Sequence, residues 1–251
     1  MNCFPLIDTR PQCQSVADFL DSTDLLVDTV EDAEMFLVAG WDGWMLDMMR
    51  KWHHHKKPFM GINCGTRGFL LNTFDQSYFA DLSEESFEYV QASLVDVTLT
   101  TKDGTVSEGF FINDLVLWAS VLDYFRFTLQ VGEKEIQTEW TGLVVATMLW
   151  STGYAANLGQ PLIGLDENVW GISGIATAPF QYDFFSPQPI TIYTRWRKPL
   201  TVWLDGYNGK YEHIEKIEIK PSDKSVQLVF FREEQFAEKR RRLAQEKTND
   251  H

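Results

Sequence analysis

A single carboxylate stands in a glycine turn near the start of the chain, where residues 36–46 read FLVAGWDGWML. Asp42 lies between Gly40 and Gly43, directly after an apolar run that is typical of a buried strand. In open α/β sheets ligands bind at this end of a strand, and the backbone N–H groups of such a turn favour anions. Asp42 could also simply cap the following helix. The residues alone leave both interpretations open.

A second glycine-bearing stretch follows at residues 61–70, which read GINCGTRGFL. Its glycines allow a ligand to approach the backbone closely, and Arg67 could meet a phosphate. Further along, in the stretch FIND at residues 111–114, Asn113 and Asp114 interrupt an apolar run. An Asn side chain can pair with N6 and N7 of adenine, although a buried Asn in a turn is the structural alternative.

The fourth stretch, residues 141–154, reads TGLVVATMLWSTGY. It combines a buried-strand pattern with a hydroxyl-rich turn that could open a helix. Ser151, Thr152 and Tyr154 could hydrogen-bond a ligand, or they could merely cap that helix. No group of residues has the spacing of metal ligands, so we predict no metal site built by the protein itself.

The composition limits the class of protein. The chain has 251 residues, 44% apolar and 23% charged, and a formal charge of −14. This charge argues against a nucleic-acid partner, because phosphate backbones select basic surfaces. No apolar run is long enough to span a bilayer, and residues 1–15 lack a signal-peptide pattern. Three cysteines without metal-type spacing fit a reducing compartment, so we expect a cytoplasmic protein without a membrane partner.

The order of apolar patterns predicts an α/β domain followed by a β domain. Strand and helix patterns alternate at residues 4–8, 15–22, 35–40, 45–52 and 58–63, which is typical of a Rossmann-like three-layer α/β domain. From about residue 87 the pattern changes to strands of a largely antiparallel domain. A hairpin turn is expected at residues 102–104, and strands are expected at 124–131, 143–149, 190–196, 200–205, 213–219 and 225–231.

The predicted domains are therefore residues 1–88 (α/β), 89–231 (β-rich) and 232–251 (a charged helix and tail). The helix has Phe236 and Leu243 on one side, so it could dock on the first domain or stay exposed.

Taken in order, the four stretches resemble the NAD kinase family. That family carries a Gly-Gly-Asp-Gly-Thr turn, a Gly-Ile-Asn-x-Gly-x-x-Gly-Phe-Leu loop and an Asn-Glu or Asn-Asp pair. An Asp-Gly-Leu strand that runs into Pro-Thr-Gly-Ser-Thr-Ala-Tyr follows. The motifs span about residues 35–160, and four ordered motifs are far more specific than any one of them.

The resemblance implies an enzyme that transfers the γ-phosphoryl group of ATP, with Mg²⁺, to the 2′-hydroxyl of the adenosine ribose of NAD. Asp42 would be the general base that takes the hydroxyl proton. By analogy the chain would form a homo-oligomer, either a dimer or a tetramer. The residues that the resemblance assigns to substrate binding are Gly40, Gly43, Asn63, Phe69, Asn113, Asp114, Thr141, Ser151, Thr152, Gly153, Tyr154 and Asn157.

The chain departs from the family pattern mainly in its glycine-rich motifs. Trp41 stands where the family has glycine, Trp44 where it has threonine, and Trp150 ends the Met-Leu-Trp run that replaces Pro-x-Gly. Thr141 replaces an aspartate, and after Asp205-Gly206, Tyr207 stands where many members have glutamine. An indole fills space that phosphate oxygens would need, and tryptophan adopts the positive φ of glycine only at a cost.

These departures leave two alternatives to an active NAD kinase. One is a catalytically weak or inactive NAD-kinase-like protein that binds dinucleotide. The other is a two-domain interaction protein with an aromatic-rich face.

Overall fold

The computed structural model describes residues 1–80, 82–119, 125–149, 158–176, 181–194, 200–209 and 213–249. The chain divides into two compact units, one made of Met1–Ala92 and Ser225–His251, the other of Ser93–Lys224. Two long strands, β4 (Phe87–Thr101) and β15 (Ile214–Phe231), contribute residues to both units.

The first unit is built on a parallel sheet. It contains β1 (Cys3–Ile7), β2 (Met35–Gly40), β3 (Phe59–Asn63) and the last residues of β15, in that order. Each neighbouring pair is parallel, and all six residues of β2 are buried. Continuous apolar runs are expected here, because a parallel strand is covered on both faces.

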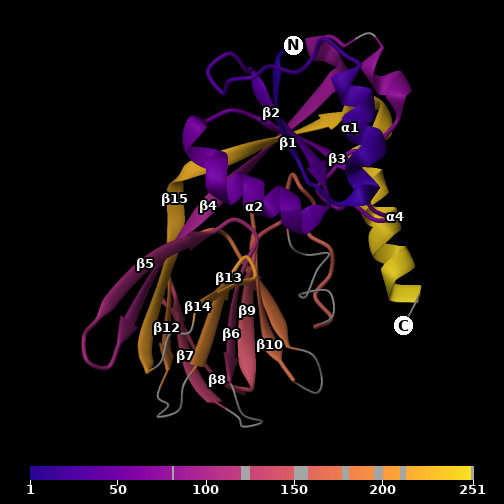
Figure 1. The fold of residues 1–251 in the computed structure, drawn as a ribbon. Coiled ribbons are helices and arrows are strands. Elements are labelled where there is room, and N and C mark those ends of the chain that lie inside the picture. Colours follow the sequence, from indigo (N-terminus) through magenta and orange to yellow (C-terminus); the bar gives the residue numbers. More distant parts are fainter. Residues whose placement is uncertain are drawn as a thin grey trace. The chain divides into compact units, whose positions relative to one another are not determined.

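Helices cover both faces of this sheet (Figure 1). On one face, Met35 and Leu37 share a core with Val16 and Leu20 of α1 (Gln14–Asp21). Side chains alternate along a strand, so Phe36 points to the other face.

On that other face, the ring of Phe36 lies 5.6 Å from Trp52 of α2 (Asp42–Trp52). Phe230 stacks on Phe236 of α4 (Phe236–Asn249) at 3.5 Å between centroids. The predicted three-layer arrangement is present, and the C-terminal helix docks on the first unit. The short helices are η1 (Pro11–Cys13), η2 (His53–His55), η3 (Gln76–Phe79), η4 (Glu84–Ser86) and η5 (Arg232–Glu234).

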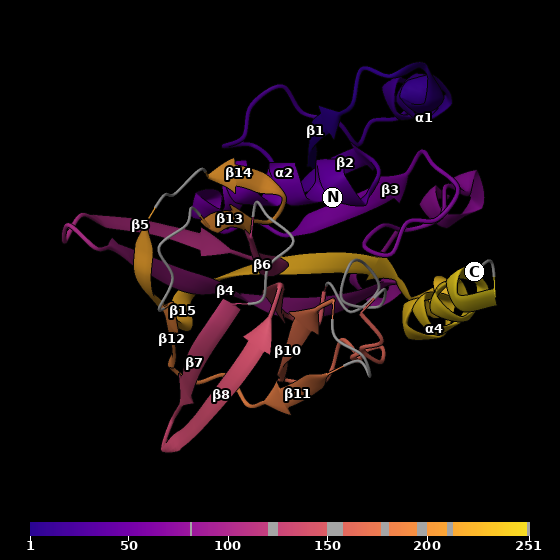
Figure 2. The same ribbon diagram turned by 90° about the horizontal axis from the view of Figure 1, so that it is seen from below.

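The second unit consists of antiparallel strands in two sheets. One sheet has the order β11-β10-β9-β6-β13-β14. In the other, β12 pairs with β15 and β7, and β7 forms a hairpin with β8 that Figure 2 shows clearly. The strands not yet given are β5 (Val106–Phe111), β6 (Asp114–Ala119), β7 (Phe125–Val131), β8 (Lys134–Trp140), β9 (Gly142–Ala146), β10 (Trp170–Ile175), β11 (Tyr182–Phe185), β12 (Ile190–Thr194), β13 (Leu200–Leu204) and β14 (Tyr207–Gly209).

The predicted hairpin turn is confirmed, because Thr101 donates its N–H to Thr105 and Gly104 has a φ of 85°. The predicted strands at 213–219 and 225–231 are one continuous strand, β15. β8 was not predicted, because as an edge strand it carries mostly polar residues (KEIQTEW). None of the helices in the described part of the chain is long and apolar enough to cross a membrane.

A buried asparagine ties β3 to β15 in the first unit. The Asn72 side chain donates to the carbonyl oxygens of Gly61 and Val229 at 2.8 and 3.0 Å. Its Oδ1 accepts the N–H of Phe231 at 2.8 Å. The carbonyl oxygen of Gly61 also accepts the backbone N–H of Asn72 at 2.8 Å, so the side chain matters most for the buried backbone groups of Val229 and Phe231.

We predict that Asn72→Ala lowers the free energy of unfolding by about 2–4 kcal/mol, because the buried N–H of Phe231 and the carbonyl oxygen of Val229 lose their bonds to this side chain. Chemical denaturation measures the loss. The matched control is Asn2→Ala at an exposed position, which should change the stability by less than about 0.5 kcal/mol. Equal losses in the two variants would contradict the prediction.

Candidate functional site

Asp42 is the first residue of α2, and its carboxylate holds the loop that follows β3. Its Oδ2 accepts the N–H of Phe69 at 3.0 Å, and its Oδ1 accepts the N–H of Leu70 at 2.8 Å. The N-cap of α2 is Trp41, in an extended conformation with φ −135° and ψ 177°. Asp42 is therefore not the simple N-cap that was one of the two sequence interpretations.

The surroundings of Asp42 raise the pKa of its carboxyl above the ordinary value. The largest cause is burial, which disfavours the charged form. The N–H groups of Phe69 and Leu70 oppose this effect, and the positive charges of Lys239 and Arg240 oppose it further. Both cationic residues belong to α4 and are buried, with exposed fractions of 7% and 2%.

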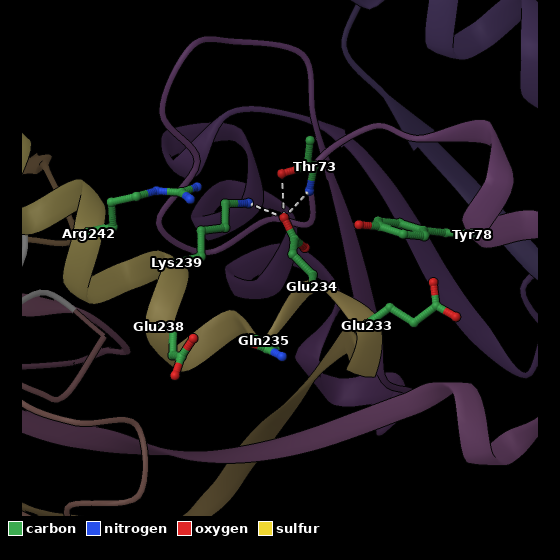
Figure 3. A pocket seen from close by; sticks show the side chains of 8 residues that line it. All are labelled: Thr73, Tyr78, Glu233, Glu234, Gln235, Glu238, Lys239 and Arg242. Carbon is green, nitrogen blue, oxygen red and sulfur yellow. Dashed lines mark hydrogen bonds and ion pairs between the residues drawn. The ribbon is translucent and has the colours of Figure 1, made fainter.

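Ion pairing and hydrogen bonds fix α4 beside the same loop (Figure 3). Lys239 donates to the carbonyl oxygen of Leu71 at 2.8 Å and to Glu234 at 2.6 Å. Glu234 also accepts from the N–H and the hydroxyl of Thr73. Burial lowers the pKa of Lys239, and its bond to Glu234 opposes that shift. No pattern in the sequence indicates that the C-terminal helix brings cations to Asp42.

A pocket of about 440 Å³ lies beside this ion pair. Three glutamates face one lysine and one arginine, so the lining does not favour a phosphate. None of the residues that the sequence assigned to substrate binding lines it. The lining residues are Thr73, Tyr78, Glu233, Glu234, Gln235, Glu238, Lys239 and Arg242.

The indole of Trp44 covers Gly40. A Cβ atom at Gly40 would lie 2.6 Å from Cδ1 of Trp44, so only glycine fits beneath this ring. The indole N–H donates to the carbonyl oxygen of Leu6 at 2.9 Å, which fixes the ring over the ends of β1 and β2. The space directly above Gly40 is therefore filled by the tryptophan.

Trp41 lies beside the same turn and makes a different contact. The guanidinium of Arg10 stacks on its ring, and Arg10 is held in turn by Asp8 at 3.3 Å. The backbone of Trp41 is extended, and neither Gly40 nor Gly43 has a positive φ. The backbone strain that the sequence suggested at Trp41 is therefore absent.

The loop between β3 and Asn72 is organised by Asn63. Its side chain donates to the carbonyl oxygens of Gly65 and Arg67 at 3.1 and 3.0 Å, and it accepts the N–H of Gly65 at 3.0 Å. Gly68 needs its positive φ of 81° here, and a Cβ would lie 2.6 Å from Cγ of Asn63. Asn63 and the buried Phe69 thus shape the loop that Asp42 holds.

In the second unit, the predicted pair Asn113 and Asp114 lies where β5 passes into β6. Asp205 accepts the N–H groups of three consecutive residues here, Ile112 at 3.0 Å, Asn113 at 2.7 Å and Asp114 at 3.1 Å. Thr147 donates its hydroxyl to the carbonyl oxygens of Ile112 and Asn113 at 2.8 and 3.2 Å. The sequence pattern alone indicates no role for Asp205 or Thr147.

Both side chains of this pair are buried, and that of Asn113 has a polar atom without a hydrogen-bond partner among the described residues. Asn113 is 1% exposed, and its Oδ1 has no hydrogen-bond partner among the described residues. Asp114 is 3% exposed, and its pKa is raised to about 8, first by burial and then by the negative charge of Asp205. A buried acceptor and a carboxyl that keeps its proton near neutral pH are suited to polar ligand atoms.

Thr141 does not join this pair. It precedes β9, whose first residue, Gly142, pairs with Trp118, whereas Ala146 at the other end pairs with Asp114. Thr141 therefore lies at the opposite end of β9 from Asp114. Six predicted residues, Trp150, Ser151, Thr152, Gly153, Tyr154 and Asn157, lie outside the described residues.

The chain is similar in sequence to bacterial NAD kinases, although no family model matches it. It is 24% identical over 219 residues to an NAD kinase of Rickettsia bellii, covering 80% of this chain and 81% of that relative. It is 31% identical over 173 residues to an NAD kinase of Oleidesulfovibrio alaskensis, covering 65% of this chain but only 57% of that relative.

The fold is similar to that of two solved structures. An NAD kinase from Archaeoglobus fulgidus in complex with ATP has a TM-score of 0.73 at 19% identity, covering 98% of this chain and 99% of that chain. A yeast NADH kinase complexed with NADH has a TM-score of 0.76 at 14% identity, covering 95% and 86%.

The fold thus defines the class, an α/β domain with a β domain as in NAD and NADH kinases, and the predicted fold class is confirmed. The resemblance to the NAD kinase family, predicted from four ordered motifs, is confirmed as well.

The raised pKa of Asp114 makes stability depend on pH. The unfolded residue releases its proton near pH 4 and the folded residue near pH 8, so the folded state binds more protons in between. This group therefore destabilises the fold increasingly as pH rises through that window. We predict that Asp114→Asn gains stability relative to the parent over this range, by at most about 1.4 kcal/mol per pH unit.

Denaturation at several pH values between 4 and 8 measures this slope. The control is Asp103→Asn, because hydrogen bonds to Thr101 and Thr105 lower the pKa of Asp103 to about 2, outside the window. A parallel pH dependence of Asp114→Asn and the parent would show that Asp114 is ionised throughout.

Proposed function

We propose that this chain is an NAD kinase, which transfers the γ-phosphoryl group of MgATP to the 2′-hydroxyl of the adenosine ribose of NAD. The observation that carries the proposal is Asp42, a carboxylate of raised pKa that holds the backbone of Phe69 and Leu70 from the first position of α2. The relatives named NAD kinase and the ordered motifs support it.

Asp42 is suited to the role of general base. Each of its oxygens accepts one backbone N–H, and a carboxylate oxygen has a second lone pair that can accept a substrate hydroxyl. A raised pKa increases the affinity of the carboxylate for the proton that it must take. As Asp42 takes this proton, the 2′-oxygen attacks the γ-phosphorus and ADP leaves.

Asn113 is the residue that we assign to the adenine. Its buried Oδ1 lacks a partner among the described residues, and an exocyclic adenine N6–H₂ group would supply the missing donor. From the resemblance we further propose substrate contacts for Gly43, Ser151, Thr152, Gly153, Tyr154 and Asn157. By the same analogy we expect a cytoplasmic homo-oligomer.

We predict that Asp42→Asn lowers the rate of NADP formation from NAD and MgATP by about two to four powers of ten, the usual loss for a general base. The matched control is Asp47→Asn, the same substitution on the same helix, which should keep the parental rate. NAD affinity and thermal unfolding should be followed as well, because Asp42 also holds Phe69 and Leu70. An Asp42→Asn variant as fast as Asp47→Asn would remove Asp42 from the mechanism.

One observation favours a second candidate, a weak or inactive kinase that still binds dinucleotide. The Trp44 ring occupies the space above Gly40, where the family motif would bring phosphate. Asn113 and Asp114, by contrast, match the family pattern.

We predict that Trp44→Thr raises the rate of phosphoryl transfer by roughly tenfold, about 1.4 kcal/mol of barrier, because it removes the indole ring that lies over Gly40. Stability should fall by about 1–3 kcal/mol with the loss of the ring contacts. The control is Trp44→Phe, which keeps a ring over Gly40 but loses the bond to Leu6, and its rate should stay parental. A parent that already turns over at about 1–100 per second would show that Trp44 does not obstruct phosphate.

A further inference from the structure

Asp205 occupies a turn that aims its side chain at the Asn113–Asp114 pair. Asp205 and Gly206 form the two-residue loop between β13 and β14, and both have a positive φ, 54° and 78°. An Asp-Gly pair suits such a type I′ turn, because both central residues must be left-handed. β13 pairs with β6, so this turn lies beside the first residue of β6.

Asp205 accepts every backbone N–H group of the two residues that link β5 and β6. Its carboxylate accepts three consecutive N–H groups, from Ile112 to Asp114, at distances of 2.7 to 3.1 Å. Its own N–H donates to the carbonyl oxygen of Asp114 at 3.0 Å. Ile112 and Asn113 are buried, so no solvent could replace these bonds.

We propose that Asp205 is a positioning residue for dinucleotide binding, whose carboxylate fixes the backbone of Asn113 and Asp114 while their side chains are kept for the ligand. This inference rests on the proposed function, because it takes NAD as the ligand. Two features of the site support it. Asn113 Oδ1 stays without a partner among the described residues, and Thr147 holds the same backbone from its carbonyl side.

Asp205 also affects the charge state of Asp114. The strands that flank β6 are β9 and β13, and neither contains an ionisable residue. Among the described residues, Asp205 at the end of β13 is the charged group that raises the pKa of Asp114, in addition to burial. Removing its charge should therefore let Asp114 ionise at lower pH, whether or not a ligand is present.

The test is Asp205→Asn, compared with Asp103→Asn. Asparagine is also favoured in a left-handed turn position, so the hairpin is retained while the carboxylate is lost. Asp103 is a matched control, because it precedes the glycine of another hairpin and accepts the N–H of Thr105. NAD affinity is measured by calorimetry between pH 6 and 9, and the titration of Asp114 in the free protein is followed by carboxyl ¹³C NMR.

We expect Asp205→Asn to weaken NAD binding about tenfold or more, as for the loss of hydrogen bonds to a charged group. The midpoint of the Asp114 titration should move from about 8 to lower pH. Asp103→Asn should change neither quantity. If a folded Asp205→Asn variant keeps the parental NAD affinity and the Asp114 midpoint does not move, the inference about Asp205 is overturned and the proposed function stands. A parent that binds no NAD would overturn the proposed function.

Thr147→Val provides a second route if Asp205→Asn lacks a cooperative melt. It removes the hydroxyl bonds to Ile112 and Asn113 and keeps the shape of the side chain. We expect a severalfold loss of NAD affinity from the loosened backbone. Parental affinity in this variant would show that the position of Asn113 and Asp114 does not depend on these bonds, and would overturn the inference.

Discussion

A partly buried carboxylate that accepts consecutive backbone N–H groups is the interaction on which both candidate regions depend. Asp42 holds Phe69 and Leu70 in this way, and Asp205 holds the three residues from Ile112 to Asp114. A buried charge without donors is costly, and buried N–H groups without acceptors are costly too. Each carboxylate removes both costs at once. The loop after β3 and the link between β5 and β6 are therefore fixed by single side chains rather than by regular secondary structure.

The donors and charges around a carboxyl also shift its pKa, in addition to the effect of burial. Burial raises the pKa of Asp42, but two N–H groups and the cations of α4 act against that rise. For Asp114, burial and the charge of Asp205 act in the same direction, and its pKa reaches about 8. Hydrogen bonds to the charged form thus oppose the rise of the pKa at Asp42, whereas the charge of Asp205 adds to the rise at Asp114.

The sequence predicted the features that local patterns encode. The apolar run of β2, the hairpin turn at Asp103 and each of the four motifs depend on residues close together in the chain. The contacts that organise the candidate residues join distant positions instead. Asp42 meets Phe69 27 residues later, and Asp205 meets Ile112 across 93 residues. The Asp-Gly turn was visible in the sequence, but its partner depends on β13 lying beside β6, which no local pattern specifies.

The structure also changes what the glycines of the motifs imply. Gly40 is required because the ring of Trp44 lies on it, and Gly68 is required because Asn63 lies against it at a positive φ. Both have structural reasons that involve no phosphate, so their presence alone does not indicate a phosphate site. Ligand binding is better inferred from polar groups that the fold buries and leaves unused. By that criterion Asn113, with its unpartnered Oδ1 among the described residues, is stronger support for a dinucleotide site than any glycine of the turn.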